Sequence, residues 1–281
     1  MDQVQYGEME LKNLGHVYDP EGLHKVVIQD VNLKIPRGKL TVLVGPSGCG
    51  KTTLVNIMAG YHPSTSGQVL LDGVPIRGPC LDRLVIFQET SLFPWMTTMG
   101  NATFGPMVQG KSRTEAEGMA MKLIEKVGLK GFETKYPAQL SGGMQRRAEL
   151  VRALINNPKI MLMDEPFRGL DAMTREIMQE HLLRLYEETK MTVFFITAEL
   201  EEAIFLGDQV VIMSSRPGTV REIVDIDLPR PREFKMMATE RYLELKKRIA
   251  VAIHEEAVKA FKSGKVVGAD LVEAYGKAKE E

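Results

Sequence analysis

Long apolar runs and cysteines are both scarce in this sequence. No window approaches eighteen uninterrupted apolar residues, so no segment is predicted to span a membrane. The two cysteines, Cys49 and Cys80, cannot form a disulfide framework and fit a reducing compartment. The N-terminal stretch lacks a basic start followed by an apolar run, so we expect no secretory signal. A role at a membrane is therefore expected to depend on a partner.

Net charge and repetition are low as well. The formal net charge is −1, which gives no reason to expect nucleic acid or an anionic bilayer as a direct partner. There is no internal repeat and no low-complexity tract. The 281 residues are 44% hydrophobic and 26% charged, an ordinary globular balance that allows one large domain or a domain with an appendage.

Short apolar strands and helical stretches alternate along the chain. Strands are expected at residues 9–14, 25–35, 39–44, 159–163, 192–197 and 209–213, and helices at 52–59, 114–127 and 141–154. Pro217 and Gly218 suggest a hairpin, and two prolines within 228–232 suggest a linker. Apolar residues at every fourth position then predict one more helix: Leu245, Ile249, Ile253, Ala257 and Phe261. This alternation is typical of a mostly parallel sheet covered on both faces.

A glycine-rich loop carries the clearest functional signal. Residues 45–53 read GPSGCGKTT and match the phosphate-binding pattern G-x-x-x-x-G-K-[ST]. Its glycines let consecutive amides point inward around phosphates, and the following helix adds its positive N-terminal end. Lys51 can reach the β- and γ-phosphates, and the Thr52 hydroxyl can ligate Mg²⁺, so ATP and Mg²⁺ are the expected cofactors. The expected nucleotide contacts are Gly45, Pro46, Ser47, Gly48, Cys49, Gly50, Lys51, Thr52 and Thr53.

An acidic pair indicates the second half of the site. Residues 160–165 read IMLMDE, an apolar run typical of the strand whose aspartate holds the metal ion, usually through water. Neighbouring residues on a straight strand point to opposite faces, so the two acids cannot both bind one ion directly. At the bend that ends the strand, we expect Asp164 to bind Mg²⁺ and Glu165 to activate the attacking water.

Four further segments make the sequence similar to the ABC-transporter ATPases. Residues 140–147, LSGGMQRR, resemble the signature loop of that family. The resemblance implies that Ser141, Gly142 and Gly143 contact ATP held by the opposite subunit, so that hydrolysis requires a head-to-tail pair. Ser141 is expected to cap a helix whether or not it binds ATP.

The other three segments carry single residues. Gln88, in VIFQET, matches the family's Q-loop glutamine, which implies contact with the metal and the attacking water. Tyr18 fits the aromatic residue on which adenine stacks, although an aromatic side chain there can also be a packing residue. Asp171, in GLD, matches the D-loop aspartate next to the nucleotide.

The resemblance runs from about residue 9 to residue 232 and implies an α/β fold. We expect a P-loop NTPase core of ABC type, with a mostly parallel sheet flanked by helices and an antiparallel β subdomain. The ATPase domain is expected at 1–231, with an α-helical subdomain inserted at about 89–157, and a C-terminal helical extension at 232–281. The C-terminal helix could dock on its own cassette, cover a dimer interface or bind a regulator.

Two stretches look most like the nitrate/sulfonate/taurine importer branch. They are LFPWMT at 92–97 and SSRPGTVREIVDIDLPRPR at 214–232. The implied assembly contains a second ATP-binding subunit, transmembrane permease subunits and, indirectly, a substrate-binding protein. The chain is then expected at the cytoplasmic face of the inner membrane, held there by the permease. A soluble ABC protein that remodels DNA or ribosomes is a rival, but such proteins tend to carry two cassettes and basic surfaces.

One residue departs from the family's pattern. Residues 196–203 read ITAELEEA, which places Ala198 where the family has a histidine that can donate to the γ-phosphate. Losing one such donor typically costs on the order of 10²–10³ in turnover. Three explanations stay open: a weak or regulatory half of a heterodimer, a slower homodimer that relies on Glu165, and an engineered change that traps ATP. Arg168 also stands where the family usually has a small residue.

Overall fold

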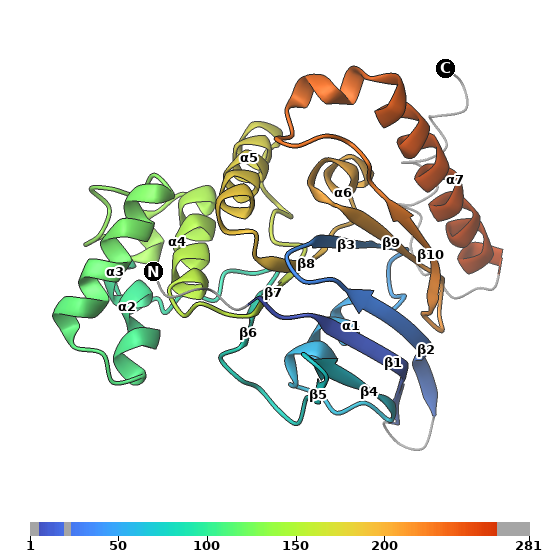
Figure 1. Cartoon of the computed structure of the whole chain (residues 1–281), viewed down its shortest axis with the longest axis horizontal. Helices are drawn as coiled ribbons and strands as arrows, with labels where there is room; N and C mark the ends of the chain where they lie inside the picture. The colour runs from blue at the N-terminus through green and yellow to red at the C-terminus, as the bar shows by residue number, and fades with distance from the viewer. Residues whose placement is uncertain (1–5, 20–23, 263–281) are drawn as a thin grey trace.

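The computed structural model describes residues 6–19 and 24–262 and contains two sheets (Figure 1). The antiparallel sheet has the order β2-β1-β4-β5. Its strands are β1 (Met9–Tyr18), β2 (Lys25–Ile35), β4 (Ser66–Leu71) and β5 (Val74–Pro75). The second sheet has the order β10-β9-β3-β8-β7-β6 and is parallel except for β10. Its strands are β3 (Leu40–Val44), β6 (Arg83–Ile86), β7 (Ile160–Asp164), β8 (Thr192–Ile196), β9 (Gln209–Met213) and β10 (Val220–Asp225).

The parallel strands are mostly apolar because both faces of their sheet are covered. Every residue of β3, β7 and β8 is buried. Alternate residues enter two different cores: Val193 and Phe195 pack among the helices, whereas Phe194 and Ile196 pack towards α1 (Lys51–Ala59) and the antiparallel sheet. The α/β P-loop architecture predicted from the sequence is therefore confirmed.

The remaining helices lie in two groups (Figure 1). Between β6 and β7 the chain forms α2 (Thr98–Val108), α3 (Arg113–Lys126), the short helix η2 (Pro137–Gln139) and α4 (Gly142–Leu154), with α2 packed against both α3 and α4. After β7 come α5 (Ala172–Thr189), α6 (Leu200–Leu206), the short helix η3 (Phe234–Ala238) and α7 (Glu240–Lys262). Within the described ranges, no helix has the length and hydropathy needed to cross a membrane.

The C-terminal helix α7 docks on its own chain, one of the three alternatives that its pattern left open. It packs on α6, β9 and η3. Leu245 and Ile249 are buried as predicted, but Phe261 is exposed, and the buried Glu256 belongs to the docked face instead. Glu256 accepts a hydrogen bond from the backbone N–H of Ser215 at 3.0 Å, so α7 also holds the loop after β9.

The predicted linker at 228–232 is anchored by its two arginines. Arg230 pairs with Asp208 at 2.9 Å, and the buried Arg232 donates to the carbonyl of Ile204 at 2.9 Å. Burial lowers the pKa of Arg232 to about 10. Asp208 also accepts from the backbone N–H of Leu40 at the start of β3 and from the hydroxyl of Tyr186, so this segment ties the sheet to α5.

Candidate nucleotide site

The predicted site residues converge at the carboxyl edge of the parallel sheet, where ligands bind in open α/β folds. One cavity of about 550 Å³ lies there. The predicted residues that line it are Tyr18, Ser47, Gly48, Gly50, Lys51, Thr52, Thr53, Gln88 and Glu165. Four lining residues were not expected to contact the nucleotide: Lys25, Val27, Arg168 and Arg216. Within the described residues, no group of three or more His, Cys, Asp or Glu side chains could hold a metal ion, so a cation here would also need other oxygen ligands, such as the Thr52 hydroxyl.

The glycine-rich loop between β3 and α1 has the backbone shape of an anion cradle. Gly48 and Gly50 have φ angles of 74° and 106°, in the left-handed region that favours glycine. The ammonium of Lys51 donates to the carbonyl oxygens of Gly45 at 2.9 Å and Pro46 at 3.4 Å. A cation folded over its own loop, beside the positive end of α1, makes the cavity suitable for a polyphosphate.

Two oxygen ligands suitable for Mg²⁺ are neighbours: Thr52 lines the cavity, and Asp164 is buried beside it. Asp164 ends β7, is only 5% exposed and is hydrogen-bonded to the hydroxyl of Thr52. Burial raises the pKa of Asp164, the Thr52 hydrogen bond opposes that rise, and the neighbouring Glu165 charge adds to it. A buried carboxylate beside a hydroxyl is the kind of donor set that a divalent cation stabilises.

Glu165 lies at the bend that the sequence predicted after the strand. Its φ of 45° is unusual for a residue other than glycine, and its N–H donates to the carbonyl of Ile196 on β8 at 3.0 Å. The bend turns its carboxylate into the cavity, where it forms an ion pair with Arg168 at 3.0 Å. Strain of this kind is often retained at functional sites.

Gln88 is exposed at the rim of the cavity, and α4 holds its backbone. The guanidinium of Arg146 donates to the carbonyls of Phe87 at 2.7 Å and Gln88 at 2.5 Å. Arg146 is itself buried and paired with Glu149 at 2.5 Å. The segment LSGGMQRR contains Arg146, but the motif gives no sign that this arginine joins α4 to the Gln88 segment.

The predicted signature residues do not line the cavity of their own chain. Ser141 caps α4, accepting from the N–H of Met144 at 3.3 Å, and is exposed. A Cβ at Gly143 would lie 2.8 Å from the Thr174 side chain, and one at Gly142 would lie 3.4 Å from Leu170, so this loop packs closely against the start of α5. Asp171 caps α5, and its hydrogen bonds with Thr174 lower its pKa.

Two other expected contacts have distinct surroundings. Tyr18 is 37% exposed, and its hydroxyl lies 3.5 Å from that of Thr53, so its ring stands at the mouth of the cavity. Cys49 is 1% exposed, and burial raises the pKa of its thiol. Of these two side chains, only that of Tyr18 is exposed enough to contact the adenine of a bound nucleotide.

Arg216, in the loop after β9, is a cavity residue that the sequence motifs did not indicate. Its guanidinium donates to the carbonyl of Gly48 at 2.9 and 3.2 Å. The same loop is held by α7 through the contact between Ser215 and Glu256. In its segment, SSRPGTV, the sequence predicted only a hairpin at Pro217 and Gly218 and a likeness to one importer branch.

Comparison with known proteins identifies the family. The sequence profile described as ABC transporter matches residues 28–168. The chain is 44% identical over 255 residues to an uncharacterized ABC transporter ATP-binding protein of Methanocaldococcus jannaschii, covering 91% of this chain and 94% of that protein. The chain belongs to the ABC transporter family. It is the ATP-binding, ATP-hydrolysing subunit of such a transporter.

Other similar proteins support the same family assignment for this ABC ATPase. The taurine import ATP-binding protein TauB of Roseobacter denitrificans is 43% identical over 215 residues, covering 76% of this chain and 80% of that protein. The dimeric structure of a bacterial ABC transporter cassette superposes with a TM-score of 0.70 at 29% identity, covering 79% of this chain and 100% of that one. A related cassette structure, in a post-hydrolysis state bound to ADP and phosphate, superposes with a TM-score of 0.68 at 28% identity.

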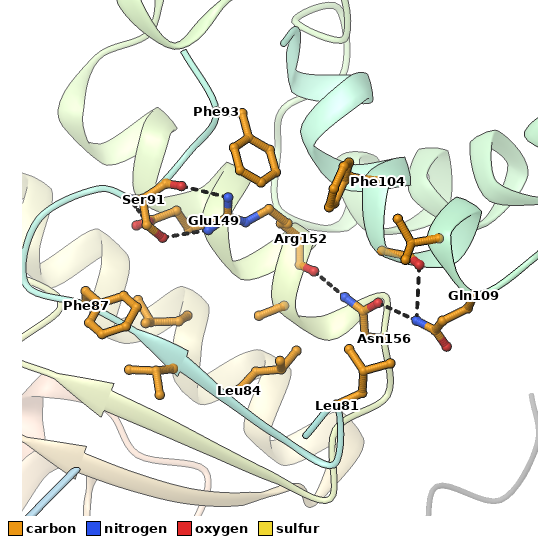
Figure 2. A pocket seen from close by; sticks show the side chains of 15 residues that line it. Leu81, Leu84, Phe87, Ser91, Phe93, Phe104, Gln109, Glu149, Arg152 and Asn156 are labelled. Atoms are coloured by element: carbon orange, nitrogen blue, oxygen red, sulfur yellow. Dashed lines mark hydrogen bonds between the residues drawn. The ribbon is translucent and has the colours of Figure 1, made fainter. Parts of the chain in front are cut away.

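The ABC ATPase also has an apolar groove beside Gln88, between β6 and helices α2 and α4 (Figure 2). Its volume is about 370 Å³, and its lining includes Leu84, Phe87, Phe93, Phe104 and Val108. A polar row closes one side: Arg152 donates to the Ser91 carbonyl at 2.7 Å, Asn156 donates to the Arg152 carbonyl at 2.7 Å, and Gln109 donates to Asn156 at 2.8 Å.

Proposed function

We propose that this ABC ATPase powers import of a small anion or related solute, and that Glu165 activates the water that attacks ATP. The observation that carries the proposal is the meeting of Lys51, Thr52, Gln88 and Glu165 in one cavity. The likeness to a protein named for taurine import supports the direction of transport and the class of solute. So do the sequence stretches shared with the nitrate/sulfonate/taurine branch.

Each residue has one task in the proposed reaction. Lys51 and the amides of its loop hold the β- and γ-phosphates, and Tyr18 supports the adenine. Thr52 and Asp164 would hold Mg²⁺, with Gln88 close to it, and the ion would neutralise charge that develops on the phosphates. Glu165 accepts the proton of the water whose oxygen forms the new bond to phosphorus.

The proposed active unit is a pair of ATP-binding subunits. Ser141 and Gly143 lie outside the cavity of their own chain, and Ser141 is exposed at the start of α4, which supports contact with ATP held by a facing subunit. Asp171 lies on the same surface, at the start of α5. The dimeric structure of a related cassette supports the same arrangement.

The proposed permease contact is the groove. It is apolar, it opens beside Gln88, and Phe104 and Val108 on α2 are 41% and 71% exposed. A short helix of a membrane-embedded permease that packed there would press on the Gln88 segment, which Arg146 joins to the signature helix. Exposed apolar surface beside a catalytic segment suits a partner that senses ATP.

The remaining assignments follow from that assembly and stay predictions. The ATPase domain is proposed at 1–231, with the helical subdomain at about 89–157 and the C-terminal extension from 232. The chain would sit at the cytoplasmic face of the membrane, held by the permease, and a substrate-binding protein would deliver the solute. A second candidate function, a regulatory or slow partner in a heterodimer, is favoured by Ala198, which offers no donor at the end of β8.

Two substitutions test the proposed chemistry. Lys51→Ala removes the phosphate-binding cation and should weaken ATP binding at least about tenfold, because a charged hydrogen-bond partner is lost. Glu165→Gln keeps the shape of the side chain. This variant should bind Mg²⁺ and ATP but should no longer hydrolyse ATP. Binding is measured by titration calorimetry and turnover by phosphate release. Unchanged ATP affinity in Lys51→Ala, or unchanged turnover in Glu165→Gln, would contradict the assignment.

A further inference from the structure

Arg168 is placed to act on the same phosphate as Glu165. It follows β7 by four residues, and its backbone N–H donates to the carbonyl of Glu165 at 3.1 Å in a tight turn. Its guanidinium lies 3.0 Å from the Glu165 carboxylate. The Arg168 side chain is 64% exposed, whereas that of Glu165 is 14% exposed, so the arginine can leave this ion pair without unpacking the core.

The cations of the cavity occupy different positions. Lys51 is buried over its own loop, and Arg216 donates to Gly48 in that loop. Arg168 is the one that contacts the glutamate predicted to activate water. At the end of the neighbouring strand β8, Ala198 presents only a methyl group. Of the described cations that line the cavity, which also include Lys25, Arg168 is the one paired with Glu165.

The ion pair opposes hydrolysis as it stands. Glu165 must accept a proton from water, and a guanidinium on its carboxylate occupies an oxygen that would take this proton. The terminal phosphate of ATP is a stronger attraction for that guanidinium than a single carboxylate. Transfer of Arg168 from Glu165 to the γ-phosphate would thus free the base and bring donors to the group that reacts.

We propose that Arg168 is a catalytic residue: on ATP binding it moves from Glu165 to the γ-phosphate and stabilises the transition state there. This inference rests on the proposed role of Glu165. The water oxygen forms a bond to the γ-phosphorus, the bond from that phosphorus to the bridging oxygen breaks, and ADP departs with the electron pair. The water proton goes to Glu165. Arg168 donates to the equatorial oxygens throughout and neither gains nor loses a proton.

The test compares Arg168→Ala, Arg168→Lys and Arg168→Ala/Ala198→His with the wild type. Removing one transition-state donor should lower kcat of Arg168→Ala about 100-fold, with the KM for ATP changed less than about threefold. Arg168→Lys should retain part of the rate, since lysine keeps the positive charge but not the paired N–H donors of the guanidinium. Adding Ala198→His should raise kcat at least about tenfold above that of Arg168→Ala, because it restores a donor after β8.

Other outcomes of these measurements would overturn the inference. If Arg168→Ala hydrolyses ATP as fast as the wild type or faster, Arg168 only restrains Glu165 and the inference is wrong. Failure of Ala198→His to raise the rate of Arg168→Ala would also count against it. Unfolding curves check that each variant is folded, and Arg168→Gln, which keeps most of the side chain, replaces Arg168→Ala if it is not. Glu165→Gln runs in parallel: if it keeps full turnover, the proposed function fails, not this inference alone.

Discussion

Asp164 and Glu165 are adjacent in the chain, but the end of β7 gives their carboxylates different surroundings. Asp164 is buried against Thr52, whereas Glu165 bends at a φ of 45° and faces Arg168. The motif predicted this division because two neighbours on a strand cannot point the same way. It did not predict the ion pair, because an arginine three residues away reaches the glutamate only through the turn.

Asp164→Asn tests the environment of the buried acid. Burial raises the pKa of Asp164 in the folded chain, so the folded state binds a proton more readily than the unfolded state. The contribution of this residue to stability therefore falls as pH rises through and above the ordinary aspartate value. We expect Asp164→Asn without nucleotide to melt at a higher temperature than the wild type at pH 7.

The same variant should lose the further stabilisation that Mg²⁺ adds to ATP, because one of the proposed ligands is gone. Thermal melts with and without Mg²⁺ and ATP measure both effects. Thr53→Ser is a mild control in the same helix. A variant that melts below the wild type without nucleotide would show that the Thr52 hydrogen bond outweighs the cost of burial.

At the scale of elements, the sequence predicted the most apolar strands, and β1 and β2 besides, but not β4, β5 or α2. β3, β7, β8 and β9 were expected from their apolar runs. α2 contains Pro106 and two glycines, which argue against a helix. It is held by Asn101, which is fully buried and makes hydrogen bonds with Phe93. Such a contact depends on the tertiary fold and produces no periodic pattern in the sequence.

The segment around Asp208 shows the same limit. Pro229 and Pro231 predicted a linker at 228–232, but Arg230 in that segment pairs with Asp208, and Arg232 donates to the carbonyl of Ile204. Burial alone would raise the pKa of Asp208, yet hydrogen bonds from Tyr186 and Leu40, with the charge of Arg230, lower it. A depressed pKa stabilises the folded chain above the ordinary aspartate value, and this contribution is lost as pH falls below that value.

Asp208→Asn should therefore lower the free energy of unfolding by about 3 kcal/mol at pH 7, because several buried hydrogen bonds to a charge are lost. The difference from the wild type should shrink as pH falls towards about 3.5, below the ordinary aspartate pKa. Urea unfolding across this pH range measures the difference in the free energy of unfolding. Asp225→Asn, at an exposed position on β10, is the matched control and should change little. A difference that is constant with pH would contradict the argument.

Val108→Asp tests the groove as the permease contact. Val108 is 71% exposed on α2, so the substitution should leave folding and the ATPase activity of the isolated chain intact. A carboxylate buried against an apolar partner should weaken the complex with the membrane subunits by more than ~1.4 kcal/mol, or tenfold in Kd. Val251→Asp, at a 52% exposed position on α7, is the control. Equal recovery of membrane subunits with both variants would exclude the groove.

At the scale of the whole molecule, the predicted nucleotide contacts fall into two groups that do not meet. The cavity holds the phosphate loop, Gln88 and Glu165, while Ser141 is exposed at the start of α4 and does not line it. The LSGG motif predicted Ser141 as a nucleotide contact through its family resemblance alone. No spacing in the sequence could predict that this contact belongs to another copy, because the arrangement of two chains is not a local property.

The most direct test of this account mixes two variants, Lys51→Ala and Ser141→Asp. Aspartate can still cap α4, but its charge repels the triphosphate; Ser141→Asn, with the same shape and no charge, is its control. Each variant alone should lack ATPase activity, since both composite sites of its dimer are damaged. Mixing them should restore about a quarter of the wild-type rate, because half of the dimers are mixed and each has one complete site of two. Full activity of Ser141→Asp alone, or no recovery on mixing, would contradict the claim that ATP is held between two copies of this chain.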